Sequence, residues 1–279
     1  MTQESSWRGF ASDNYAGIHP EVLEAISRAN YGHDVAYGDD VVTERLRDAV
    51  KDHFGANAQI YPVFNGTGAN VVALQAMTRR WEAVVCSATA HVNVDEGGAP
   101  EHGAGLKLWT VPTPDGKLTP ALIDTQAWGF GDVHRAQPGA VTLTQSTELG
   151  TLYTVEEISA ITEHAHSLRM GVHVDGARIG NAAASLGTGF RAFTTDAGVD
   201  AISFGGTKNG LMIGEAVIVL NEPAAPGVDF LRKSSMQLAS KMRFISAQLL
   251  ALLTDDLWLR NAQHANAMAA TLDARVRQI

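Results

Sequence analysis

Short apolar runs alternate with segments of helical periodicity along most of this chain, and no other feature constrains its fold as strongly. The runs are rich in Val and Ile and are separated by helical segments or glycine-rich loops, as is typical of strands buried in a sheet. The alternation predicts an α/β fold with a mostly parallel central sheet flanked by helices. The expected strands are Val84–Ser87, Ala140–Thr144, Gly171–Asp175, Ala201–Phe204 and Ala216–Leu220.

The expected helices follow from apolar residues that recur every three or four positions and from signals at the helix ends. The clearest start is Thr154-Val155-Glu156-Glu157, which has the pattern of a capping box. The segments with helical periodicity are Pro20–Ala29, Thr43–Phe54, Val71–Arg80, Thr154–Leu168, Phe230–Leu253 and Asp256–Val276.

Composition narrows the classes of protein. A chain of 279 residues with a formal net charge of −9 is too acidic for a general binder of nucleic-acid backbones. It has no apolar run of about 18 residues to span a membrane, and the polar stretch Met1 to Arg8 is unlike a signal peptide. The single cysteine, Cys86, suits a reducing compartment, so we expect the cytoplasm. Its apolar neighbours favour a buried, inert thiol over a catalytic one.

Metal binding is not expected. His164 and His166 are two positions apart on a predicted helix and cannot face the same ligand. Two glycine-rich loops are better candidates for a functional site. Gly66-Thr67-Gly68 lies before the helix expected at Val71–Arg80, where small residues let backbone N–H groups approach a phosphate. Such turns are also common without a ligand, and the spacing is not that of a Walker P-loop.

The second glycine-rich loop, Gly205-Gly206-Thr207-Lys208-Asn209-Gly210, presents a lone lysine. Lys208 is either an exposed turn residue or a lysine placed to form a Schiff base. Asp175 ends the strand Gly171–Asp175, at the edge where open α/β sheets bind ligands. It could instead be an ordinary turn residue or an ion-pair partner of Arg178. His91, after the strand ending at Ser87, is a cap, a surface residue or a group that lies against a flat ring.

Together these four loops match the requirements of pyridoxal 5'-phosphate chemistry. That cofactor needs a lysine, an acid at its pyridine nitrogen, a phosphate cradle and a group on the ring face. The chain offers them in the order cradle, His91, Asp175 and Lys208, with the acid 33 residues before the lysine. This order resembles the aspartate-aminotransferase-like, or type I, fold of pyridoxal-phosphate enzymes.

More closely, the chain resembles the L-threonine aldolases of the low-specificity, β-eliminating lyase group, from about Phe10 to the C-terminus. Seven motifs carry the resemblance: Phe10-Ala11-Ser12-Asp13-Asn14, Tyr37-Gly38-Asp39-Asp40, Asn65-Gly66-Thr67-Gly68-Ala69-Asn70, His91 with Glu96-Gly97-Gly98-Ala99, His173-Val174-Asp175-Gly176-Ala177-Arg178, Ser203-Phe204-Gly205-Gly206-Thr207-Lys208-Asn209-Gly210 and Gln237-Leu238-Ala239-Ser240-Lys241-Met242-Arg243. The resemblance implies reversible cleavage of L-threonine, L-allo-threonine and related β-hydroxy-α-amino acids to glycine and an aldehyde.

The resemblance also implies how the cofactor is held. Lys208 would carry it as an aldimine, Asp175 would keep the pyridine nitrogen protonated, and His91 would stack on the ring. The residues implied at the phosphate are Gly66 and Thr67, with Thr207 and Arg243 as further candidates.

For the substrate, the resemblance implies that Arg178 and Ser12 hold the carboxylate, with Arg178 also contacting the 3-oxygen of the cofactor. We expect His91, directly or through a water molecule, to be the base that removes the β-hydroxyl proton. Many family members carry a second histidine where this chain has Glu148. Glu148 is therefore either an acid–base or hydroxyl-orienting group, or a loop acid without a chemical role.

The resemblance divides the chain into an N-terminal arm (1–18), a large cofactor-binding domain (19–245) and the start of a small C-terminal domain (246–279). Family members continue into a complete small domain that supplies a further arginine, so this chain is expected to be either a truncated form or part of a longer chain. A homodimer or homotetramer with shared active sites is expected, with Tyr37 and Arg243 as candidates to reach across. The alternatives are another type I enzyme (a β-eliminating lyase, a racemase or an aminotransferase) and an inactive relative that serves as a subunit.

Overall fold

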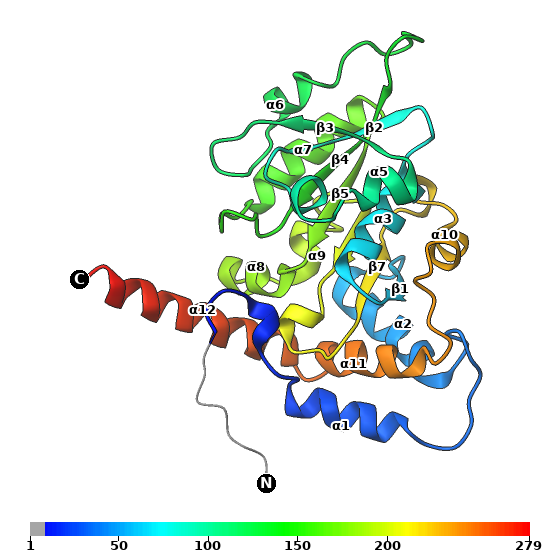
Figure 1. Ribbon diagram of the computed structural model, residues 1–279, viewed down its shortest axis with the longest axis vertical. Coiled ribbons are helices and arrows are strands. Elements are labelled where there is room, and N and C mark those ends of the chain that lie inside the picture. The colour runs from blue at the N-terminus through cyan, green and yellow to red at the C-terminus, as the bar shows by residue number, and fades with distance from the viewer. Residues whose placement is uncertain (1–8) are drawn as a thin grey trace.

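The computed structural model describes residues 9–279, and its centre is one sheet of seven strands. The strands lie in the order β1-β7-β6-β5-β4-β2-β3 (Figure 1). Within this part of the chain, β7 is antiparallel to both of its neighbours and the other neighbouring pairs are parallel, which confirms the expected mostly parallel sheet. The strands are β1 (Gln59–Val63), β2 (Glu82–Ser87), β3 (Lys107–Val111), β4 (Gln137–Thr144), β5 (Gly171–Gly176), β6 (Ala201–Phe204) and β7 (Glu215–Val219).

Helices cover both faces of this sheet (Figure 1). The α-helices are α1 (Pro20–Ala29), α2 (Val41–Phe54), α3 (Gly66–Met77), α4 (His91–Val94), α5 (Ala99–Ala104), α6 (Pro120–Asp124), α7 (Val155–Ser167), α8 (Ile179–Leu186), α9 (Phe190–Phe193), α10 (Val228–Ser234), α11 (Arg243–Leu253) and α12 (Leu257–Val276). Three short 3-10 helices are η1 (Asp13–Tyr15), η2 (Thr207–Asn209) and η3 (Glu222–Ala224). The core on one face includes α2, α7, α9 and α11, and the core on the other includes α3, α4 and α10.

Strand β7 shows why the apolar runs of the sequence are continuous rather than alternating. Ala216 and Ile218 join the core on the α2 side, whereas Val217 and Val219 join the core on the α3 side. Because successive side chains of a strand point to opposite faces, a strand covered on both faces needs apolar residues at every position.

Several elements agree with the sequence to the residue. The expected helix Pro20–Ala29 is α1, and the expected strand Ala201–Phe204 is β6. The capping box at the start of α7 is confirmed, because Thr154 accepts a bond from the Glu157 N–H and the Glu157 carboxylate accepts one from the Thr154 N–H. Strands β1 and β3 were missed. They form the two edges of the sheet, and Pro62 within β1 weakens its strand signal.

The prediction of one long helix over Phe230–Leu253 is wrong. It is two helices, α10 and α11, separated by residues 235–242, and Met236 in this connection has a positive φ of 61°. The side chain of Gln237 turns back from this segment and accepts a hydrogen bond from the Phe64 N–H at 3.0 Å. The apolar spacing on either side is helical, but this long-range contact interrupts the helix and has no signal in the periodicity.

The helix expected at Val71–Arg80 has the wrong bounds. Helix α3 begins at Gly66, five residues earlier, because the Asn65 side chain accepts a bond from the Gly68 N–H at 2.7 Å and caps it. The glycine-rich segment is thus the first turn of the helix rather than a loop before it. The helix ends at Met77, before the extended backbone of Thr78.

The C-terminal helices pack on the large α/β unit. Helix α11 lies against α1 and α2, and α12 lies against α8 and then extends away from it (Figure 1). The domain boundary expected at residue 245 falls inside α11, and residues 1–8 of the expected arm lie outside the described residues. Among the described residues, no helix is long and apolar enough to cross a membrane.

Candidate active site

The candidate site residues gather at the carboxyl ends of the parallel strands. Asp175 lies in β5, His91 begins α4 after β2, and Glu148 follows β4. Lys208 is in η2 after β6, and α3 begins directly after β1. Since these five strands run in the same direction, their carboxyl ends meet at one edge, where open α/β sheets bind ligands.

Asp175 is a nearly buried carboxylate, with 6% of its surface exposed. Its Oδ1 accepts a bond from the Ala177 N–H at 3.0 Å, and its Oδ2 accepts one from Asn70 Nδ2 at 2.8 Å. A carboxylate has about four acceptor positions, so Asp175 can still accept a proton donor such as a pyridinium N–H. His173 lies two residues before Asp175 in β5. It is fully buried between the Thr142 and Ser203 hydroxyls, and burial lowers its pKa to about 4.

His91 is held by two carboxylates. Its ring Nδ1 lies 3.0 Å from Glu96 Oε1, and this hydrogen bond raises the pKa of His91. Its backbone N–H donates to Glu148 Oε1 at 2.7 Å. Glu96 has no exposed side-chain surface, and burial raises the pKa of its carboxyl group. Reasoning from the sequence did not assign Glu96, although it stands five residues after His91 in the motif that carries the resemblance.

Glu148 presents one free oxygen. Its Oε1 accepts bonds from the His91 N–H and, at 3.0 Å, from the Thr144 hydroxyl. Its Oε2 is buried and has no hydrogen-bond partner among residues 9–279. An acceptor of this kind normally has a donor, so it can receive one from a bound molecule.

Lys208 stands on a turn that has no room for larger residues. A Cβ at Gly205 would overlap the Ala177 carbonyl, and one at Gly206 would overlap Leu211. The buried Glu215 holds this turn by accepting bonds from the Gly206 N–H at 2.7 Å and the Thr207 N–H at 3.2 Å. Burial raises the pKa of Glu215 to about 7. Glu215 was missed in the sequence, where a lone acid in an apolar strand was its only signal.

The start of α3 has the chemistry of an anion site. The backbone N–H groups of Gly66 and Thr67 donate to no group within the described chain, because they belong to the first helical turn. A Cβ at Gly66 would meet open space, whereas one at Gly68 would overlap the Gln237 side chain. Free N–H groups on an accessible backbone at a helix N-terminus suit a phosphate.

The N-terminal arm brings two further candidates together. Arg178 donates from Nε to Asp13 Oδ2 at 2.8 Å and from Nη2 to Asp13 Oδ1 at 3.3 Å. Ser12 precedes this aspartate and accepts bonds from Asn14 at the start of η1, which contacts η2. The arm therefore lies beside the turn that carries Lys208.

Two candidates lie elsewhere. The guanidinium of Arg243 lies over the ring of Tyr31, 5.1 Å from its centre, and donates to the Gly32 carbonyl at 3.4 Å. Tyr37 is half exposed, and its ring lies under the Lys233 ammonium at 4.9 Å. No hydrogen bond or ion pair within residues 9–279 joins either one to Lys208 or to the start of α3.

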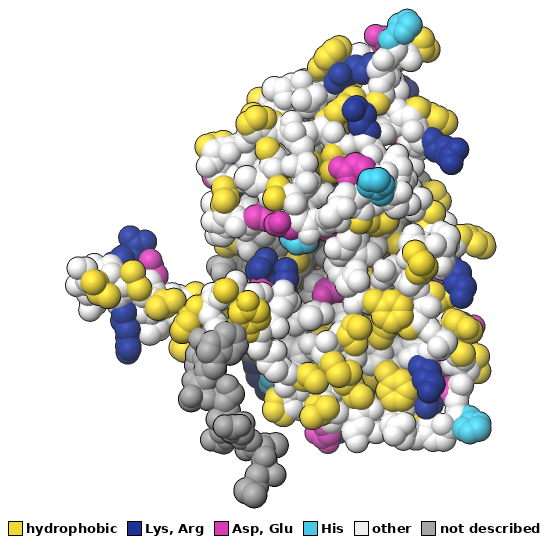
Figure 2. Space-filling model, viewed as in Figure 1, with side chains coloured by type: hydrophobic (Ala, Val, Ile, Leu, Met, Phe, Trp, Pro, Cys, Tyr) yellow, Lys and Arg dark blue, Asp and Glu magenta, His cyan; other side chains and the backbone are white. Residues whose placement is uncertain are grey.

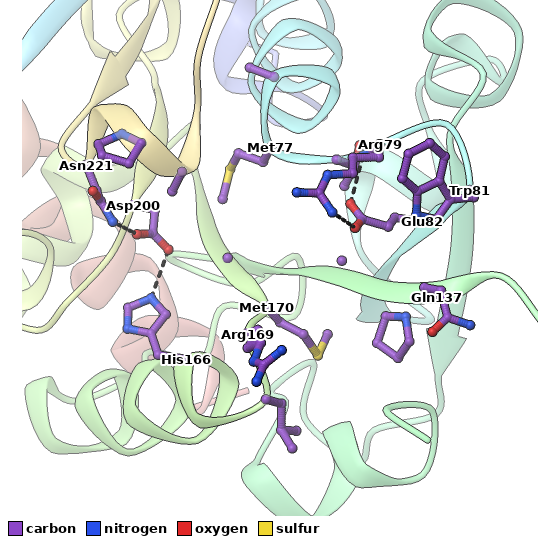
Figure 3. Close-up of a pocket in the computed structure, with 18 of the residues that line it drawn as sticks. Met77, Arg79, Trp81, Glu82, Gln137, His166, Arg169, Met170, Asp200 and Asn221 are labelled. Carbon is purple, nitrogen blue, oxygen red and sulfur yellow. Dashed lines mark hydrogen bonds and ion pairs between the residues drawn. The ribbon is translucent and has the colours of Figure 1, made fainter. Parts of the chain in front are cut away.

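A separate cavity of about 950 Å³ lies at the other end of the parallel strands, away from their carboxyl ends (Figure 3). It lies at the amino ends of β2, β4 and β5 and includes Arg79, Trp81, Arg169 and Met170. At its side, His166 contacts the buried Asp200 at 2.9 Å. None of the site candidates lines this cavity. The described residues contain no group of three or more His, Cys, Asp or Glu side chains placed to hold a metal ion.

The sheet order and the similarity to solved structures define the class of fold. The chain has the type I fold of pyridoxal-phosphate-dependent enzymes, and it superimposes on aspartate aminotransferase from Thermus thermophilus with a TM-score of 0.65 at 15% identity, covering 90% of this chain and 66% of that one. Residues 9–279 match the model of the beta-eliminating lyase family, and the chain belongs to this family. The family and the fold imply pyridoxal phosphate as the cofactor.

Relatives within this family are similar along the whole chain. The low specificity L-threonine aldolase of Pseudomonas sp. (strain NCIMB 10558) is 45% identical over 100% of this chain and 80% of its own length. The Pseudomonas aeruginosa protein of the same name is 46% identical over 97% of this chain and 78% of its own length. The structure of Leishmania major threonine aldolase aligns with a TM-score of 0.91 and 30% identity, covering 96% of this chain and 79% of that one.

Proposed function

We propose that this chain is a pyridoxal-phosphate-dependent aldehyde-lyase that cleaves L-threonine, L-allo-threonine and related β-hydroxy-α-amino acids to glycine and an aldehyde. The observation that carries the proposal is the meeting of Lys208, His91 and Asp175 at the carboxyl ends of the parallel strands, from η2, the start of α4 and the end of β5. The relatives at 45–46% identity are named as low specificity L-threonine aldolases, which supports the choice of reaction.

The residues at this edge fit the cofactor. The open N–H groups of Gly66 and Thr67 suit its phosphate, and Asp175 keeps acceptor positions for its pyridine nitrogen. Lys208 supplies the amine for covalent attachment, and Thr207 lies next to it. Arg243, from a neighbouring copy, is a further phosphate ligand in this proposal. When bound, the cofactor supplies an electron-accepting ring that stabilises the negative charge left on Cα.

The substrate is held and deprotonated by groups of this chain. Arg178 binds the α-carboxylate with its planar guanidinium, and Ser12 donates its hydroxyl to the same carboxylate. His91 would lie against the cofactor ring beside the β-hydroxyl group, and it would take the proton of that group as the Cα–Cβ bond breaks. Glu148 orients the hydroxyl group through its free Oε2, which has no other donor within the described chain.

A second copy of the chain completes the site in this proposal. Hydrophobic side chains gather on the lower part of the face in Figure 2, over α1, α2 and α10. The exposed large hydrophobic residues of these helices and their connections include Leu23, Tyr31, Tyr37, Val41, Phe230 and Met236. Exposed apolar patches of this kind mark protein interfaces, so we propose a homodimer or homotetramer. We place it in the cytoplasm, because the single cysteine suits a reducing compartment.

The test is an assay of the protein reconstituted with pyridoxal phosphate. We expect release of acetaldehyde and glycine from L-threonine, and loss of this activity in Lys208→Ala. The control is Lys51→Ala, whose exposed side chain pairs with Asp48 far from the site. Amino transfer that depends on a 2-oxo acid, or cofactor binding without turnover of any β-hydroxy-amino acid, would contradict the proposed reaction.

A further inference from the structure

Asn70 joins two carboxylates at the carboxyl edge of the sheet. Its Nδ2 donates to Asp175 Oδ2 at 2.8 Å and to Glu96 Oε1 at 2.7 Å, so both amide hydrogens are in use. The three residues come from α3, β5 and the connection between α4 and α5, and all three are buried. They bring together the carboxylate that would face the pyridine nitrogen, Asp175, and the carboxylate that contacts His91, Glu96.

The orientation of the amide follows from its partners. Ionised carboxylates accept hydrogen bonds and do not donate them, so Nδ2 of Asn70, and not Oδ1, must face both Glu96 and Asp175. Two neighbouring negative charges repel each other, and the shared donor offsets part of that repulsion. Asn70 Oδ1 and Glu96 Oε2 are buried without partners among residues 9–279, so the bridge is the main polar contact of this amide.

Glu96 also fixes the ring of His91. Its Oε1 lies 3.0 Å from His91 Nδ1, so in the neutral ring the proton is on Nδ1 and the lone pair is on Nε2. Nε2 has no partner within residues 9–279, and 37% of the His91 side chain is exposed. Nε2 is therefore the nitrogen that can reach a bound molecule.

We propose that Glu96 is a positioning residue for the cleavage reaction: it holds His91 with Nε2 free to take the β-hydroxyl proton, and Asn70 couples this pair to Asp175. The inference rests on the proposed function, in which His91 is the base and Asp175 faces the pyridine nitrogen. No proton crosses Asn70. The coupling is electrostatic, because each carboxylate changes the free energy of charge on the other.

The charged groups around His91 determine whether the loss of Glu96 raises or lowers the pKa of His91. The hydrogen bond to Glu96 is the largest influence and raises the pKa of His91, and the negative charge of Asp175 acts in the same direction. Burial and the ammonium of Lys208 act against it. The carboxylate of Glu148 meets the backbone N–H of His91. Since Glu96 is the only one of these groups bonded to the ring within residues 9–279, its removal lowers the pKa of His91.

The first measurement is made on the protein without cofactor. We expect a titration of the His91 ring followed by NMR to show a pKa lower by about one unit or more in Glu96→Gln, because glutamine can still accept the Nδ1–H bond but carries no negative charge. Glu101→Gln is the matched control, because Glu101 is an exposed acid on α5 outside the site. It should leave the His91 titration unchanged.

The second measurement uses the reconstituted enzyme. Glu96→Gln should lower kcat by about 10- to 100-fold, below the roughly 10²–10⁴-fold contribution of a general base itself. KM should stay within about twofold, because Glu96 does not touch the substrate. The acid limb of the pH profile should move to lower pH, and Glu96→Asp should restore part of kcat. A purely structural role would not move the pH profile.

Asn70→Ala tests the coupling to Asp175. Without the bridge, Glu96 should hold a proton more readily, and the pKa of His91 should fall as in Glu96→Gln. The thermal stability of Asn70→Ala should be measured alongside its activity, because the substitution removes a buried amide. Glu96→Gln, which keeps size and shape, decides the inference if Asn70→Ala does not fold.

An unchanged pKa of His91 in Glu96→Gln would overturn the inference, as would an unchanged kcat and pH profile. If the wild-type enzyme cleaves threonine and Glu96→Gln behaves like it, the inference fails and the proposed function stands. If the wild-type enzyme cleaves no β-hydroxy-amino acid, the proposed function fails and the catalytic part of the inference fails with it. The NMR titration still decides whether Glu96 controls His91.

Discussion

The guanidinium of Arg178 forms a two-point ion pair with Asp13, which ties the N-terminal arm to the start of α8. The pair is partly exposed, with 39% of the Arg178 side chain and 36% of the Asp13 side chain accessible. An arginine held in this way keeps donors free for a second carboxylate, because a guanidinium has five N–H groups. The arm thus places the group that we propose for the substrate carboxylate.

Arg178→Lys should raise KM for threonine by about tenfold or more, because an ammonium cannot make the paired hydrogen bonds of a guanidinium. Steady-state kinetics with the reconstituted enzyme measure this effect. Arg191→Lys is the control, since Arg191 pairs with Asp196 on the surface near α9. An unchanged KM in Arg178→Lys would remove Arg178 from the substrate site.

Glu148→Gln should lower kcat and leave the free energy of unfolding nearly unchanged. Glutamine can still accept the bonds from the His91 N–H and the Thr144 hydroxyl, so the loop keeps its contacts. It replaces the free Oε2 by an N–H donor and removes the negative charge, which weakens its hold on the substrate hydroxyl. We expect a fall in kcat of about tenfold or more. Wild-type kcat in this variant would assign Glu148 to the structure of the loop alone.

Glu215→Gln should remove a pH dependence of stability. Burial raises the pKa of Glu215 to about 7 from an ordinary value of 4.5, so between these values the folded chain holds a proton that the unfolded chain has lost. The contribution of this group is full below about pH 4.5 and is lost as the pH rises through 7. Urea unfolding of the cofactor-free protein at pH 5 and pH 8 should show a smaller difference in the variant. An equal difference would contradict this assignment.

His173→Asn should remove a pH dependence of stability that has the opposite sign to that of Glu215. Burial lowers the pKa of His173 to about 4 from an ordinary value of 6.5, so the unfolded chain binds a proton in this range and the folded chain does not. The wild-type protein loses stability from this group as the pH falls from about 6.5 through 4. Unfolding curves across this range should be flatter for the variant, and a parallel pair of curves would contradict the prediction.

Gly205→Ala should destabilise the turn that carries Lys208. The new Cβ would overlap the backbone carbonyl of Ala177, which cannot move without shifting the end of β5. We expect a loss of about 1–3 kcal/mol in the free energy of unfolding, measured with denaturant. Gly189→Ala is the matched control, because nothing lies within 4 Å of a Cβ there. Equal stability of the two variants would show that the turn is not tightly packed.

The sequence predicted the parts of the fold that depend on local pattern. Buried apolar runs identified the inner strands, and the capping box identified the start of α7. The edge strands β1 and β3 have weaker patterns because they are only partly covered. The break between α10 and α11 depends on the contact of Gln237 with Phe64, 173 positions apart. No local pattern contains such a contact.

The candidate site likewise contains residues that the sequence predicted and residues that it did not. Residue type and position after a strand were enough to propose Lys208, Asp175 and His91, which the fold brings to one edge. The buried acids Glu96 and Glu215 were missed, because a single acid in an apolar or glycine-rich segment has no spacing signal. Their positions are determined by hydrogen bonds that form only after the strands are assembled.

Lys208 is the proposed attachment point of pyridoxal phosphate, on which the whole proposed reaction depends. The direct measurement is borohydride reduction of the protein incubated with pyridoxal phosphate, followed by mass spectrometry of its peptides. We expect one pyridoxyl group per chain, on the peptide that contains Lys208, and no labelling of Lys208→Ala. A label on another lysine, or no label in a protein that remains folded, would contradict it.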